Sequence, residues 1–64
     1  MTILDGLEKV LAKNHLTREE AAQITQEILS GEASSIQEAA FLVALAMKGE
    51  TEAELLGVAS VLRG

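Results

Sequence analysis

Residues 34–54 read SSIQEAAFLVALAMKGETEAE, an apolar run with a helix start at each end. Ser34 is followed three residues later by Gln37, and Thr51 is followed by Glu54 at the same spacing. Each pair fits a capping box, in which the hydroxyl and the longer side chain each accept a hydrogen bond from the other residue's backbone N–H. Gly49 lies between them, and glycine readily takes the left-handed conformation that ends a helix. The stretch therefore predicts two successive helices.

The same helix start and stop signals recur toward the N-terminus. Thr17 and Glu20 form a third capping box, and Ser35 with Glu38 offers an alternative start one residue after Ser34. Gly31 falls where the helix that starts after Thr17 should end. These signals are local, so they place helix boundaries without reference to the rest of the fold.

Together these signals predict an all-α fold, a small antiparallel bundle of four short helices. We expect the helices over about residues 3–13, 18–30, 35–48 and 52–63, with Asn14 ending the first one. The short connections are typical of antiparallel neighbours. No segment alternates apolar and polar residues with β-branched enrichment, so no strand is expected.

Length and composition limit the possible function classes. The chain has 64 residues, a formal charge of −5, no cysteine and one aromatic residue, Phe41. We therefore expect a single helical domain over 1–64, with neither a disulfide nor a thiolate metal site. Nucleic acid is not an expected partner, because its binding depends on Lys and Arg contacts to phosphate. The longest apolar run, 39–47, is too short for a membrane span, and a cytoplasmic location is expected.

No constellation of residues looks catalytic. His15 is the only imidazole and lies in a predicted turn, where a solvated or capping role is expected. Paired carboxylates occur at predicted helix starts, where they complement the helix dipole. We therefore predict no catalytic, cofactor-binding or metal-binding residue in this chain.

The apolar faces of the helices carry more information. Residues 39–47 include no polar side chain, so the third helix is predicted to be buried on nearly every side. The fourth helix leaves only a narrow polar strip at Glu54, Gly57 and Ser60. Four short helices cannot cover so much apolar surface, and an exposed apolar patch usually marks an interface. The predicted interface residues are Leu4, Leu7, Leu11, Leu55, Leu56, Val58 and Leu62. The alternative is a compact bundle in which alanines allow close helix approach.

The run ILSGEASSIQEAAFLVALAMKGET over 28–51, preceded by LTREEAA over 16–22, also carries a family resemblance. It resembles the N-terminal helical domain of the anthranilate phosphoribosyltransferases, and more broadly the helical domain shared with pyrimidine and thymidine nucleoside phosphorylases. This resemblance covers nearly the whole chain. It implies a helical domain that forms the subunit interface of a homodimer and one wall of an active-site cleft.

In that family the chemistry belongs to a following α/β domain. The resemblance implies that a glycine-rich G-T-G-G-D segment there cradles phosphoribosyl pyrophosphate and that acidic residues hold magnesium. No residue of 1–64 matches those positions, so no catalytic or metal residue carries over. The expected role is dimerisation within a larger enzyme, with the parent's own α/β domain and later helices as further contacts. The alternatives are the helical domain of a pyrimidine nucleoside phosphorylase and a standalone helical module that binds a partner helix.

Overall fold

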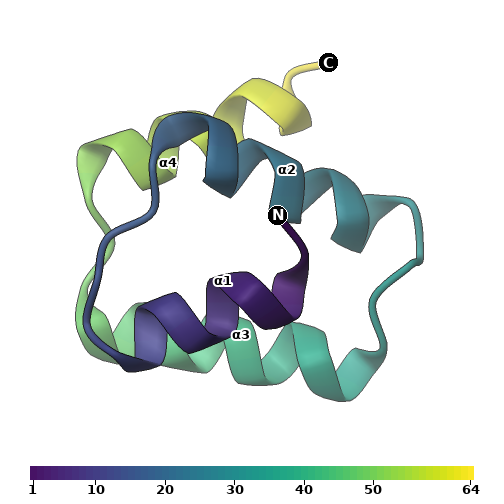
Figure 1. The fold of residues 1–64 in the computed structure, drawn as a ribbon. Coiled ribbons are helices and arrows are strands. Elements are labelled where there is room, and N and C mark those ends of the chain that lie inside the picture. Colours follow the sequence, from purple (N-terminus) through teal and green to yellow (C-terminus); the bar gives the residue numbers. More distant parts are fainter.

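The computed structural model describes all of residues 1–64 and contains four helices and no strand. The helices are α1 (Ile3–Leu11), α2 (Arg18–Leu29), α3 (Ser35–Lys48) and α4 (Glu52–Leu62). Consecutive helices run in opposite directions (Figure 1). The predicted all-α bundle of four short helices is confirmed. None of these helices has the length and apolar character that crossing a bilayer requires.

Every helix begins with a capping box. The three predicted boxes are confirmed, and the third helix uses Ser34 rather than the alternative Ser35 as its cap. A fourth box, Thr2 with Asp5, starts α1 and was not predicted, because the usual motif has Glu or Gln at the third helical position. Since each box satisfies two backbone N–H groups that lack helical partners, all four starts are fixed locally.

The helix ends predicted at the two glycines agree with the structure, and the end predicted at Asn14 does not. Gly31 and Gly49 have φ values of 80° and 92°, as predicted for residues that follow a helix. The first helix, however, ends at Leu11, and Lys13 rather than Asn14 takes the left-handed conformation, with φ 65°. The Asn14 N–H donates to the Lys9 carbonyl at 2.9 Å, which closes the terminal turn one residue earlier than predicted.

The helices pack in two pairs that alternate along the chain. α1 lies against α3, and α2 lies against α4, with α1 also touching α2 (Figure 1). The apolar core between the pairs draws on α1, α2, α3 and the connecting segments. Its buried members are Ile3, Val10, Leu16, Ala21, Ile24, Ala33, Phe41, Ala44 and Leu45.

Polar contacts and a close approach hold α1 to α2. The Glu27 carboxylate accepts a hydrogen bond from the Ile3 N–H at 2.8 Å, and Lys9 pairs with Glu20 at 2.8 Å. Gly6 lies against Ile24 so closely that an added Cβ would overlap the Ile24 side chain. The two helices therefore approach through a glycine and are fixed near both ends.

Candidate functional site

α3 presents an apolar face to solvent. Ile36 is 82 % exposed and Met47 is 84 % exposed, and Leu42 and Val43 are also exposed. The prediction that this helix is buried on nearly every side is therefore wrong. Among the helices α3 packs mainly against α1, so only its opposite side, with Phe41, Ala44 and Leu45, enters the core.

The exposed apolar surface of α3 continues onto α1. Leu11 and six residues of α3 line an open groove that has no polar side chain; the six are Ile36, Ala39, Ala40, Val43, Ala44 and Met47. Leu4 is exposed two turns before Leu11 and on the same side of α1. We call this surface the α1–α3 face and define it by Leu4, Leu11, Ile36, Val43 and Met47.

α4 presents a second apolar face, which we define by Leu55, Leu56 and Leu62. All three are exposed, Leu62 by 65 %. The predicted polar strip on this helix does not face solvent: Glu54 and Gly57 are buried, and Ser60 is half-buried. The reason is Gly57, which lets the backbone of α4 approach the Arg18 carbonyl and the Ala21 side chain of α2. The helix therefore turns its leucines outward.

The predicted interface residues divide into two groups. Leu7 and Val58 are partly buried and pack against the core. The other five are exposed: Leu4, Leu11, Leu55, Leu56 and Leu62. The exposed residues of α3 were missed, although Ile36, Ala40, Val43 and Met47 recur at the spacing of one helix face. That any of these residues forms an interface stays a prediction.

Glu54 is the centre of a buried polar cluster. Its side chain is fully buried, and its carboxylate accepts from the Leu16 N–H at 2.7 Å and the Thr51 N–H at 2.8 Å. The Lys48 ammonium lies 2.9 Å from the same carboxylate and also donates to the Gly49 carbonyl at 3.0 Å. The cluster therefore joins the α1–α2 connection to the end of α3 and the start of α4.

The pKa of Glu54 reflects this setting. Burial by itself raises the pKa of a carboxyl, because it disfavours the charged form. Here the hydrogen bonds donated by Leu16 and Thr51, together with the Lys48 charge, outweigh burial and hold the pKa of Glu54 below its ordinary value. The carboxylate is therefore ionised at neutral pH and paired.

A histidine lies at the surface beside the Glu54 cluster. His15 is exposed, and its Nδ1 lies 3.0 Å from the Lys48 ammonium. No three His, Asp or Glu side chains come together in a way that could hold a metal ion.

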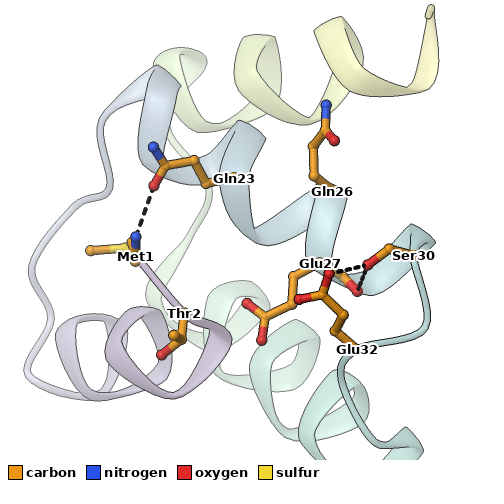
Figure 2. Close-up of a pocket in the computed structure, with 7 residues that line it drawn as sticks. All are labelled: Met1, Thr2, Gln23, Gln26, Glu27, Ser30 and Glu32. Carbon is orange, nitrogen blue, oxygen red and sulfur yellow. Dashed lines mark hydrogen bonds between the residues drawn. The ribbon is translucent and has the colours of Figure 1, made fainter.

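A shallow polar hollow lies between the N-terminus and the second half of α2 (Figure 2). The Met1 ammonium donates to the Gln23 side chain at 2.9 Å, and Ser30 donates to Glu32 at 3.1 Å. These contacts, and the bond from the Ile3 N–H to the Glu27 carboxylate, engage the side chains of Gln23, Glu27, Ser30 and Glu32 within the protein. The apolar faces are therefore the stronger candidates for function.

Comparison with known proteins identifies the family of this chain. Residues 4–64 match the family model described as the glycosyl transferase family, helical bundle domain. The chain is 49 % identical over 63 residues to the anthranilate phosphoribosyltransferase of Chloroflexus aurantiacus and to that of Myxococcus xanthus, and 48 % identical to that of Hydrogenovibrio crunogenus. Each alignment covers 98 % of this chain.

The same alignments cover only 18–19 % of the relatives. The chain thus spans about a fifth of the length of the curated relatives it matches. No solved structure gives a significant match.

Proposed function

This chain belongs to the helical bundle domain family of the glycosyl transferases, and from that membership we propose that it serves as the N-terminal helical domain of an anthranilate phosphoribosyltransferase. The parent enzyme would transfer a phosphoribosyl group from phosphoribosyl pyrophosphate to anthranilate, in tryptophan biosynthesis and in the cytoplasm. The identity of 44–49 % to relatives of that name, over nearly the whole chain, supports this choice.

Within the parent, the proposed role is structural. The observation that carries this proposal is the exposed apolar surface, with Ile36, Val43 and Met47 on α3 and Leu55 and Leu62 on α4 all open to solvent. Apolar patches of this kind on small domains usually mark contact surfaces. We propose that they serve in homodimer formation and in contact with the parent's own α/β domain.

The proposal assigns no catalytic step and no cofactor to this chain. Magnesium and the phosphoribosyl donor would be held by the α/β domain of the parent.

Sedimentation of the purified chain tests the structural role. We expect a sedimentation coefficient that rises with concentration in the micromolar range, because association removes the apolar faces from water. A clean monomer at high micromolar concentration would contradict the proposal.

An enzymatic assay tests whether catalysis belongs to the α/β domain of the parent rather than to this chain. The chain incubated with anthranilate, phosphoribosyl pyrophosphate and magnesium is expected to give no phosphoribosyl anthranilate. Product formation above the background of a boiled sample would show that the chain has chemistry of its own.

A further inference from the structure

α4 is held to the protein differently from the other three helices. None of the nine buried apolar residues of the core lies on α4, and this helix contributes only the partly buried Val58 to the packing around that core. Its two buried residues are Glu54 and Gly57. Its leucines point to solvent. Because hydrophobic stabilisation scales with apolar area removed from water, α4 gains little of it.

The packing of α4 rests on one helix, and its contact with α2 is the most extensive between any two helices. α4 packs chiefly against α2, whereas α1 contacts both α2 and α3. At the centre of the α2–α4 contact, Gly57 brings backbone against backbone. Separation of α4 would expose the strip of α2 that it covers. Helix α2 would then be held by its contacts with α1, at Gly6 and at the Ile3–Glu27 and Lys9–Glu20 pairs, and by its core residues Ala21 and Ile24.

The start of α4 is held by the Glu54 cluster, which we call the Glu54 latch. It consists of the Glu54 carboxylate, the Lys48 ammonium and the N–H groups of Leu16 and Thr51. Lys48 and Thr51 are neighbours of α4 in the sequence, so Leu16 is the latch's attachment to the distant part of the chain. The charges regain hydration when the latch opens, which offsets part of the loss of their hydrogen bonds.

We propose that α4 is a separable unit, which opens as one body while α1, α2 and α3 stay folded, with the Glu54 latch as its fastening. Sub-global openings of this kind occur in contiguous elements that have few buried apolar contacts. The inference concerns the chain at concentrations where the α4 leucines stay exposed, and it does not depend on which enzyme the chain belongs to.

Native-state hydrogen exchange on the unmodified chain tests the proposal. Leu16 is a direct reporter, because its buried N–H donates to Glu54. We expect the Leu16 amide and the helical amides of α4 to exchange together, roughly tenfold or more faster than the most protected amides of α2 and α3, and with a weaker dependence on urea. Exchange of all these amides through one common opening would overturn the proposal.

A conservative core substitution distinguishes the opening of α4 alone from the unfolding of the whole chain. Ile3 is buried in α1, and Ile3→Val removes one methylene from packing that persists when α4 opens. It should accelerate exchange of the protected α2 and α3 amides roughly threefold to tenfold and leave the Leu16 and α4 amides unchanged. Equal acceleration of both groups would overturn the proposal.

Glu54→Gln tests the latch itself. It should abolish protection at Leu16 and across α4, while α2 and α3 amides keep measurable protection. Glu52→Gln, at an exposed position in the same first turn, is the matched control and should leave exchange unchanged. Loss of all protection in Glu54→Gln, or continued protection of Leu16, would contradict the assigned role of the latch.

Discussion

At the residue scale, Glu54 gives the protein a pH dependence. Its pKa is lower in the folded chain than in the unfolded chain, because its hydrogen bonds and Lys48 outweigh burial. The folded state therefore binds fewer protons in this range, and stability rises with pH. The contribution is complete above about pH 4.3, the ordinary glutamate value, and is lost as pH falls through the lower folded pKa.

Urea denaturation between pH 2.5 and pH 7 should therefore show a loss of stability on acidification that Glu54→Gln reduces. Part of the loss should persist in the variant, because hydrogen bonds also lower the pKa values of Asp5 and Glu20 in the folded chain. At neutral pH the same substitution should lower the free energy of unfolding by about 3 kcal/mol, because it leaves Lys48 buried without its counter-charge. An acid slope that is equally steep in the variant would show that other carboxyl groups cause it.

Gly57 supports a second prediction at this scale. Replacing an internal helix glycine by alanine normally stabilises a helix by about 0.5–1 kcal/mol. Here the new Cβ would overlap the Arg18 carbonyl and crowd Ala21, both of which belong to the facing helix. Gly57→Ala should therefore lower the free energy of unfolding by about 1–3 kcal/mol.

Chemical denaturation of Gly57→Ala measures that change. Ala59→Gly is the control: Ala59 is exposed on the same helix, and its loss should cost about 1 kcal/mol through helix propensity alone. A gain in stability on Gly57→Ala would mean that α4 and α2 lie farther apart than described.

At the element scale, the start of α3 distinguishes two adjacent serines. Ser34 accepts from the Gln37 N–H at 3.1 Å, whereas Ser35 is the exposed first residue of the helix. Ser34→Ala should lower the free energy of unfolding by about 1 kcal/mol, and Ser35→Ala should change it by less than about 0.5 kcal/mol. Urea midpoints of the two variants compare them directly, and equal effects would contradict the assigned register.

Helix boundaries could be predicted because their determinants are local. A capping box links residues three positions apart. Thr17, Ser34 and Thr51 therefore indicate where their helices begin, whatever the rest of the fold is. The orientation of α3 could not be predicted in this way. Residues 39–47 are apolar all round, so the sequence contains no contrast that selects the face turned toward α1.

The buried position of Glu54 is also a tertiary property. Its N–H donor on Leu16 lies 38 residues away in the sequence, and neither the spacing nor the residue types connect the two. A charged residue is almost never fully buried without a partner. Sequence reasoning therefore placed Glu54 on a solvent-facing strip, and it identified only the capping role.

At the scale of the whole molecule, single charges on the two apolar faces should weaken association. Val43→Glu on the α1–α3 face and Leu55→Glu on the α4 face each alter an exposed side chain, so the fold should persist. Burying the new carboxylate in a contact is unfavourable, and we expect the dissociation constant to rise at least roughly tenfold for the face that pairs.

Sedimentation equilibrium on both variants identifies which face mediates pairing. Gln26→Glu adds the same charge at an exposed polar position of α2 and is the matched control. If all three variants associate as the unmodified chain does, neither face mediates the contact. If the control weakens association as strongly, net charge rather than apolar contact governs it.

The alternating arrangement of the helices also constrains synthesis. Because α1 packs with α3 and α2 with α4, neither pair consists of neighbours along the chain. Residues up to Lys48 must emerge from the ribosome before α1 can pack against α3, and residues up to Leu62 must emerge before α2 can pack against α4. The nascent chain therefore cannot mature hairpin by hairpin, and its first two helices leave the exit tunnel without the surfaces that they will later cover.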